Sequence, residues 1–303
     1  MQKIKLALLA LSTILMASFF VGCNADSAPT SFRNLSSTVL TDSVFTRGIE
    51  GPAYGPDGFL YLVNYREQGT IGRMDMEGNS SIFSKLINGS IANGIRFDLH
   101  GNMYMADYVN HNILWLPKEK KPVRIFAHSD SMNQPNDLAI MDIGILFASD
   151  PNWKEETGQL WRIMPNGKIE LMEKNMGTTN GIEVSPDNKS LYVNETVQRK
   201  IWHYDLSAAG ELSNKQLFYE FKDGGMDGMR TDKEGNLYIA RYGKQHIAVL
   251  SPEGELLGKI ELKGEKPTNV AFGGTDGKTL FITLQDKKWV ETCKVPIAGR
   301  NFK

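Results

Sequence analysis

One unit of about 45 residues recurs six times along the chain, and this repetition limits the possible folds more than any other feature. Each copy places a polar residue at the same position, and the intervals between successive copies are 43, 43, 44, 47 and 42 residues. The six residues are Glu50, Asn93, Asn136, Asn180, Asp227 and Asn269. A turn position follows each of them, for example Asp57-Gly58 and Glu234-Gly235. The unit is therefore a repeated structural element.

Each unit has the pattern of four short strands. A strand is followed by a tight turn, by a second strand rich in Leu, Tyr, Ile and Phe, and by two more strands, GTIGRMDM and SSIFSKL in the first copy. Four strands in a repeat of roughly this length are typical of a propeller blade. We therefore predict an all-β fold, a six-bladed β-propeller with four antiparallel strands per blade, over residues 37–303.

The last copy lacks a fourth strand. Its three strands lie near residues 269–272, 279–284 and 290–295, after which the chain nearly stops. The segment STVLTDSVFTR, directly before Glu50, occupies the place of a fourth strand in the other copies. We predict that this N-terminal strand completes the sixth blade, closes the ring and covers an edge that would otherwise be exposed.

The N-terminus has the features of an export signal. Lys3 and Lys5 precede an apolar run that ends in FFVGC, a sequence similar to the lipobox of bacterial lipoproteins. Residues 1–22 are predicted to be a cleaved signal peptide, Cys23 to be acylated, and the polar residues 23–36 to form a tether. An uncleaved membrane anchor is the alternative, but it needs roughly 20 apolar residues. The protein is expected to be an exported lipoprotein facing the periplasm or cell surface, bound to a membrane only through its lipid.

Charge and cysteine content limit the partners and the covalent structure. With 34 basic and 35 acidic residues the net charge is -1, so no attraction to nucleic acid or anionic membranes is expected. Once Cys23 carries lipid, only Cys293 remains, and no internal disulfide can form. Cys293 lies in the apolar alternation VETCKV and is expected to be a small buried residue. The sequence carries no signal for an oligomeric state.

The six repeated polar residues should converge where the inner strands surround the channel. Two carboxylates and four amides, without His or Cys, form an oxygen-only set that suits Ca²⁺, Mg²⁺ or Mn²⁺ rather than Zn²⁺. The alternative is that each residue only caps a turn. Taken together, the ring favours a metal, because an unpaired acid in a narrow channel is costly.

A second set of residues is expected to form the walls above this ring. About fourteen positions after each of the first five ring residues come Asn64, Asp107, Asp150, Glu195 and Arg241. Aromatic residues follow them, namely Tyr65, Tyr108, Trp153 and Tyr242. Such walls suit a sugar-like or small cyclic substrate, although these rings could instead pack between blades. The sequence has neither the HExxH motif of zinc proteases nor the GxSxG motif of serine hydrolases.

Several segments match a known family. EGPAYGPDG, QPNDLAI, NGIEVSPDNKSLYVNET and GGMDGMRTDKEGNLYIARYGK resemble the gluconolactonase, regucalcin and luciferin-regenerating group of six-bladed propellers. The resemblance extends over all six repeats. It implies a divalent metal held by Glu50, Asn180 and Asp227, with Asn136 at or beside the metal. Ca²⁺ is the expected ion, with Mg²⁺, Mn²⁺ and Zn²⁺ as alternatives.

The resemblance also implies a reaction, the hydrolysis of a small-molecule lactone. The metal would polarise the carbonyl group and Asp227 would activate the attacking water. The candidate substrate contacts are Asn93, Gln134, Asn136, Trp153 and Arg241. Gln134 stands where sugar-acid-binding relatives carry an Arg, so the class of reaction is implied rather than gluconolactone itself.

Two other functions remain open. Relatives with a similar metal site hydrolyse phosphotriesters, and Asp227 could act there as a nucleophile. A non-catalytic, calcium-stabilised binding propeller is the other alternative, because this fold hosts many unrelated functions.

Overall fold

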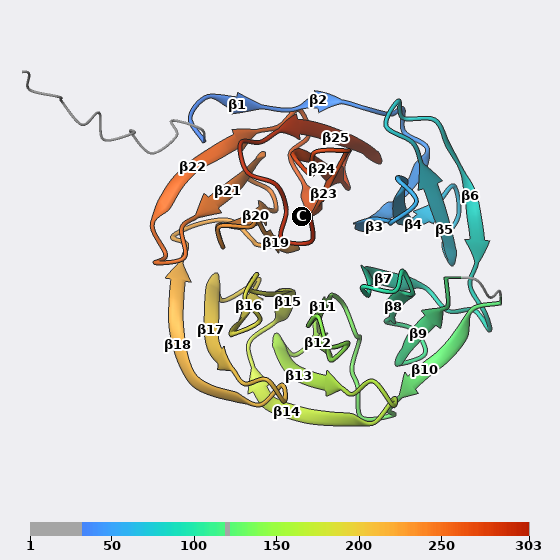
Figure 1. The fold of residues 1–303 in the computed structure, drawn as a ribbon, viewed down its shortest axis with the longest axis vertical. Helices are drawn as coiled ribbons and strands as arrows, with labels where there is room; N and C mark the ends of the chain where they lie inside the picture. Colours follow the sequence, from blue (N-terminus) through green and yellow to red (C-terminus); the bar gives the residue numbers. More distant parts are fainter. Residues whose placement is uncertain (1–31, 119–121, 303) are drawn as a thin grey trace, which may run out of the picture. The chain divides into compact units, whose positions relative to one another are not determined.

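Each repeat folds into one antiparallel sheet, and six such sheets surround a common axis (Figure 1). The computed structural model describes residues 32–118 and 122–302. The predicted all-β, six-bladed propeller with four antiparallel strands per blade is confirmed. The described residues contain no helix, and so none that is long and apolar enough to cross a membrane.

The strands of the first three blades follow one another in chain order from the axis outward. Blade one consists of β3 (Phe45–Tyr54), β4 (Leu60–Tyr65), β5 (Thr70–Met74) and β6 (Ser80–Lys85). Blade two consists of β7 (Ala92–Phe97), β8 (Met103–Asp107), β9 (Asn112–Leu116) and β10 (Arg124–His128). Blade three consists of β11 (Leu138–Ile140), β12 (Leu146–Asn152), β13 (Thr157–Ile163) and β14 (Ile169–Met176).

The other three blades repeat this order. Blade four consists of β15 (Thr179–Val184), β16 (Ser190–Glu195), β17 (Lys200–Leu206) and β18 (Leu212–Glu220). Blade five contains β19 (Met229–Thr231), β20 (Leu237–Arg241), β21 (His246–Leu250) and β22 (Leu256–Glu261). Blade six contains β23 (Pro267–Gly273), β24 (Thr279–Leu284) and β25 (Trp289–Lys294).

The N-terminal segment closes the ring as predicted. Strand β2 (Thr38–Val39) pairs antiparallel with β25 and becomes the outermost strand of blade six, with Thr38 opposite Thr292. The two ends of the propeller are thus joined by backbone hydrogen bonds, and the outer edge of β25 is covered.

The predicted boundary between tether and propeller at residue 37 is too late. Strand β1 (Leu35–Ser36) pairs in parallel with β22 and adds a fifth strand to blade five. Phe32 is only 7% exposed, and its ring meets Tyr238 edge to face with 5.9 Å between the centroids. The polar composition of the segment concealed this one buried ring. The predicted signal peptide (1–22), Cys23 and the start of the tether lie outside the described residues.

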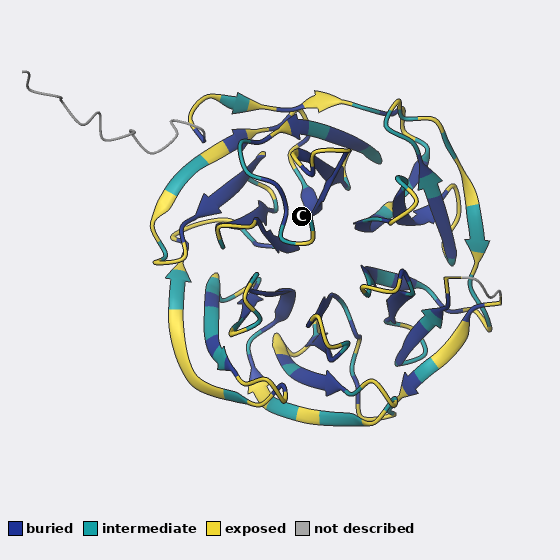
Figure 2. Cartoon of the chain, in the orientation of Figure 1, coloured by how far each residue is buried: buried dark blue, intermediate teal, exposed yellow. Residues whose placement is uncertain are grey.

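The hydrophobic core is divided among the interfaces between neighbouring blades. Six clusters of buried apolar side chains occur in the described residues, one at each interface. Val63 and Met105, for example, belong to the cluster between blades one and two. The inner strands are buried and the outermost strands are largely exposed (Figure 2). Radial packing of this kind is what holds the inner strands at a fixed distance from the axis.

Cys293 lies in the cluster between blades five and six and is 5% exposed. It forms no disulfide, and burial raises the pKa of its thiol to about 11. The prediction of a small buried residue is confirmed.

We expect Phe32→Ala to lower the free energy of unfolding by about 3 kcal/mol, because it removes a buried ring from an interface between blades. The matched change Val39→Ala, at a side chain that is 45% exposed, should cost less than about 1 kcal/mol. Chemical denaturation of both variants checks this. A loss for Phe32→Ala as small as that for Val39→Ala would show that the Phe32 ring does not stabilise the fold.

Candidate functional site at one mouth of the central channel

The repeated polar residues converge at the start of the inner strands, as their common position in the repeat predicts. One cavity of about 320 Å³ lies at this mouth of the channel. The ring residues that line it are Glu50, Asn93, Asn136, Asn180 and Asp227. The sixth, Asn269, is 1% exposed and donates from Nδ2 to Glu50 Oε2 at 3.0 Å. It therefore holds a ring member instead of lining the cavity.

Glycines let the inner strands approach one another closely at this point. A Cβ atom on Gly181 would lie 2.3 Å from the carbonyl oxygen of Asp227. One on Gly228 would lie 1.9 Å from the side chain of Asn269. No other residue fits without displacing the backbone of a neighbouring blade or the Asn269 side chain. The Asn-Gly and Asp-Gly pairs in the repeat are thus a direct result of packing at the axis.

Three oxygen atoms in the ring are buried without a hydrogen-bond partner among the described residues: Glu50 Oε1, Asn136 Oδ1 and Asn180 Oδ1. The other polar atoms of two of these side chains are engaged. Glu50 Oε2 accepts from Gly51 N and Asn269 Nδ2, and Asn180 Nδ2 donates to Thr196 Oγ1 at 3.1 Å. These bonds orient the side chains and leave one oxygen of each free. A buried acceptor without a partner is costly, and carbonyl and carboxylate oxygens of this kind are ligands for a hard cation.

The two acids of the ring lie side by side and resist simultaneous ionisation. Burial and the electrostatic effect of Asp137 raise the pKa of Glu50 to about 7. Asp227 keeps some exposure to the cavity, but the protein atoms around it and the Glu50 carboxylate raise its pKa well above the usual range. A divalent cation would remove this repulsion. Because the described residues contain no group of three His, Cys, Asp or Glu side chains suited to a metal, any such ion depends on the amide oxygens.

The backbone of Asp227 is held on both sides. Its N–H donates to Ala240 O at 2.9 Å, and its carbonyl oxygen accepts from Asn194 Nδ2 at 2.6 Å. Gly228 N donates to Thr268 O in the next blade at 2.7 Å. The carboxylate is therefore positioned by blades four, five and six.

Aromatic and polar side chains form the cavity walls. Trp153, which is 43% exposed, and Tyr242 line the cavity, and the Tyr242 hydroxyl donates to Gln285 Oε1 at 2.5 Å. Arg47 also lines it and is its one cationic lining residue. Sequence analysis missed Arg47, Thr196 and Gln285. Gln285 follows Asn269 by almost the same interval as Trp153 follows Asn136, so the repeat alignment contained a signal for it.

The other predicted wall residues have a different place. Asn64, Asp107, Asp150, Glu195 and Arg241 do not line the cavity. Four of them bond to backbone groups in the loop that leads into their own blade; Asp150, for example, accepts from Gln134 N at 2.6 Å. Asn64 instead donates to Gly48 O within β3. Backbone N–H and C=O groups that have no partner in a sheet need hydrogen bonds, and these side chains supply them.

Two predicted substrate contacts are affected by this correction. Arg241 donates to Asp223 O and Gly225 O, and its guanidinium lies 3.5 Å from the centre of the Phe221 ring. Gln134 is exposed and does not line the cavity. Asn93, Asn136 and Trp153 remain as candidate substrate contacts.

The sequence is similar to a known protein family and to several enzymes. Residues 49–286 match the family model described as SMP-30/Gluconolactonase/LRE-like region. A gluconolactonase of Zymomonas mobilis is 29% identical over 216 residues, which cover 63% of this chain and 60% of that enzyme, less than two thirds of its length. A diisopropyl-fluorophosphatase of Loligo vulgaris is 28% identical over 276 residues, covering 80% of this chain and 87% of that enzyme.

A solved structure shows the same fold. A calcium-binding protein, regucalcin from Agrobacterium tumefaciens, superimposes with a TM-score of 0.77 at 20% identity, covering 88% of this chain and 96% of the other. At this identity the likeness concerns the fold alone.

We expect the protein in a chelator to lose stability as the pH rises from about 5 to about 8. The pKa of Glu50 is raised in the folded state, from 4.5 to about 7, so its protonation stabilises the fold at low pH and is lost as the pH rises through 7. Melting temperatures measured across this range check the slope. Glu50→Gln should flatten it, whereas Glu67→Gln, at an exposed carboxylate, should leave it unchanged. A flat profile in the unaltered protein would contradict the raised pKa of Glu50.

Proposed function

The chain belongs to the SMP-30/gluconolactonase/LRE-like family, and on this premise we propose that it is a divalent-metal-dependent hydrolase that opens a small lactone ring. One observation carries the proposal. Three unpaired buried oxygens and two acids with raised pKa values meet at a cavity of the size of a sugar ring. The gluconolactonase among the relatives supports the reaction class.

Glu50, Asn136, Asn180 and Asp227 would hold the cation. Their two carboxylates balance a charge of 2+, and hydrogen bonds from Asn269 and to Thr196 orient two of them. An oxygen-only set favours Ca²⁺, with Mg²⁺, Mn²⁺ or Zn²⁺ as alternatives. When bound, the cation would supply Lewis-acid polarisation of the lactone carbonyl.

Asp227 is proposed as the general base. Its side chain lines the cavity, where its carboxylate can accept a proton from a water molecule. The water oxygen bonds to the carbonyl carbon and gives one proton to Asp227. The bond from that carbon to the ring oxygen then breaks, and the ring oxygen takes up a proton to leave as a hydroxyl group. Asn93 and Asn136 would hold the substrate through their amides.

The side chains that line the cavity restrict the substrates that it can bind. Trp153 and Tyr242 offer faces on which a sugar ring can stack, and the cavity of about 320 Å³ admits one such ring. Arg47 places a positive charge at the same mouth. A sugar lactone that carries an acidic group is therefore a candidate substrate beside a neutral one.

A phosphotriesterase is the second candidate, because the Loligo vulgaris fluorophosphatase matches 80% of this chain. The same four oxygens would hold the cation, and Asp227 would attack phosphorus as a nucleophile. A non-catalytic calcium-stabilised propeller is the third possibility that the experiment below distinguishes.

We expect Asp227→Asn to reduce lactone turnover by at least about 100-fold, because it removes the proton acceptor. The assay measures ring opening for neutral sugar lactones, acidic sugar lactones, aliphatic lactones and a phosphotriester, in chelator and after adding back Ca²⁺, Mg²⁺, Mn²⁺ or Zn²⁺. Asp130→Asn, at a side chain that is 98% exposed, is the control of equal chemistry and should keep full activity.

Three results would contradict the proposal of a metal-dependent lactonase. Turnover of the phosphotriester alone would favour the second candidate. A melting temperature raised by metal without turnover of any substrate would favour the binding propeller. Full lactone turnover in chelator would contradict the metal dependence.

We also propose that the protein is exported and anchored through lipid on Cys23, on the basis of the lysines, apolar run and FFVGC sequence before that residue. Cys23→Ser should move the protein from the membrane fraction to the soluble fraction. An unchanged membrane fraction, with the first 22 residues retained by mass spectrometry, would instead support an uncleaved anchor.

A further inference from the structure

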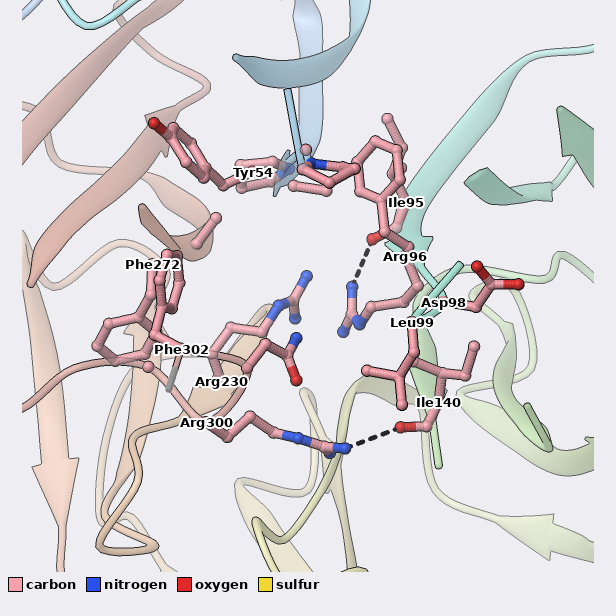
Figure 3. Close-up of a pocket in the computed structure, with 18 of the residues that line it drawn as sticks. Tyr54, Ile95, Arg96, Asp98, Leu99, Ile140, Arg230, Phe272, Arg300 and Phe302 are labelled. Carbon is pink, nitrogen blue, oxygen red and sulfur yellow. Dashed lines mark hydrogen bonds between the residues drawn. The ribbon is translucent and has the colours of Figure 1, made fainter. Parts of the chain in front are cut away.

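A second cavity, of about 470 Å³, lies at the other end of the inner strands (Figure 3). Three residues after each ring position, about 10 Å along the strand, come Ala53, Arg96, Ala139, Glu183, Arg230 and Phe272. All of these except Ala139 line the second cavity. The repeat therefore builds a second ring, which contains two arginines, and sequence analysis did not consider this position.

The C-terminal segment crosses this end of the channel. Arg300 N donates to Thr231 O in blade five at 3.2 Å. Its side chain reaches Ile140 O in blade three at 3.0 Å and Val184 O in blade four at 2.6 Å. Figure 1 shows the chain ending near the middle of the ring. Arg300 and Phe302 thus become part of the cavity wall.

Three guanidinium groups lie around the cavity floor, and their side chains are 7–10% exposed. Arg96 and Arg230 contact Asp137 at 3.1 and 3.3 Å, and Arg300 contacts Glu183 at 3.3 Å. The only further carboxylate on Arg300 is that of Asp142, at 3.4 Å, whose side chain is 53% exposed. Among the described residues, three buried cations therefore face two buried carboxylates, Asp137 and Glu183, and the half-exposed Asp142.

Arg230 is the least compensated of the three. Its Nη1 donates to Asp137 Oδ2 and to Met229 O, but its Nη2 is buried without a hydrogen-bond partner among the described residues. Burial and the neighbouring Arg96 lower the pKa of Arg230, although Asp137, Glu183 and Glu50 act in the opposite direction. Such a group is stabilised by an anion that supplies both the charge and the missing acceptor.

Apart from the acids Asp98, Asp142 and Glu183, much of the wall is apolar. Tyr54, Phe272 and Phe302 lie on one side and Leu99 and Ile140 on another, with the guanidinium groups between them (Figure 3). An inorganic anion would leave these surfaces in contact with water. An anion with an apolar body would cover them.

We propose that this cavity is a binding site for a small organic monocarboxylate, with its carboxylate between Arg230 and Arg300 and its apolar body against Phe272 and Phe302. A monocarboxylate adds one negative charge beside the guanidinium group whose Nη2 lacks an acceptor, whereas a phosphate dianion would add two next to the carboxylates already present. A planar carboxylate also matches the geometry of a guanidinium. This site is separate from the proposed catalytic cavity, and its existence does not depend on the lactonase proposal.

The test compares benzoate with its neutral analogue benzamide by isothermal titration calorimetry and thermal shift on the purified protein. We expect one benzoate per chain and a raised melting temperature, with no such effect of benzamide. Arg300→Gln should weaken benzoate binding at least about tenfold, since it removes a positive charge from the cavity wall.

A second pair of variants avoids disturbing buried groups. Leu99→Glu adds a negative charge at the cavity rim on a side chain that is 71% exposed, and it should weaken benzoate binding about tenfold. Ile82→Glu adds the same charge on outer strand β6, where the side chain is 48% exposed, and should bind benzoate like the unaltered protein.

Several outcomes would overturn the proposal. They are the absence of saturable benzoate binding, equal binding of benzamide, or equal affinity of Leu99→Glu and Ile82→Glu. Binding that is lost in Asp227→Asn but retained in Arg300→Gln would place benzoate in the other cavity. Inorganic phosphate that competes with benzoate at equal affinity would overturn the assignment to a carboxylate.

Discussion

The close approach of six inner strands around one axis is the constraint on which the rest of this structure depends. Backbone groups of neighbouring blades come so near that a Cβ atom at Gly181 or Gly228 would overlap Asp227 or Asn269. The strands are held there by apolar clusters between the blades. The same crowding brings polar side chains together, and it leaves no room for a hydrogen-bond partner for each of their polar atoms. Unpaired oxygens at one end of the channel and an unpaired guanidinium nitrogen at the other are its consequences.

The two ends of the channel differ in charge and are connected by one buried carboxylate. Asp137 accepts from Arg96 and Arg230 on one side, while Asn269 donates to both Asp137 and Glu50. The arginines lower the pKa of Asp137, against the effect of its burial, and Asp137 in turn raises that of Glu50. The arginines therefore keep Asp137 ionised, and its charge opposes ionisation of the ring acids. Each end of the channel suits a counterion of opposite sign, a cation at one and an anion at the other.

The repeat shows which residues are equivalent in sequence, but it does not show which of them reach the cavity. About fourteen positions after the ring residue, the blades use Asp107, Asp150, Glu195 and Arg241 to bond loop backbone, and Asn64 to bond Gly48 in β3. Their charges suggested a role in the cavity, but the strands turn them toward the loops. Arg47 was overlooked because its segment was interpreted only as the strand that closes the ring. Phe32 was overlooked because one aromatic residue in a largely polar segment has no periodicity to reveal it.

The sequence by itself determined the number of blades, the strand order within each blade, the closure by the N-terminal segment and the ring from Glu50 to Asn269. These features follow from a repeat, and a repeat states which residues are equivalent. Only the tertiary structure decided which equivalent residues meet, because that depends on the rotation between blades and on the path of the C-terminal segment. The placement of Arg300 beside Glu183, 117 positions away in the chain, is such a result. The packing of Phe32 against Tyr238 is another, since no local pattern relates two such distant residues.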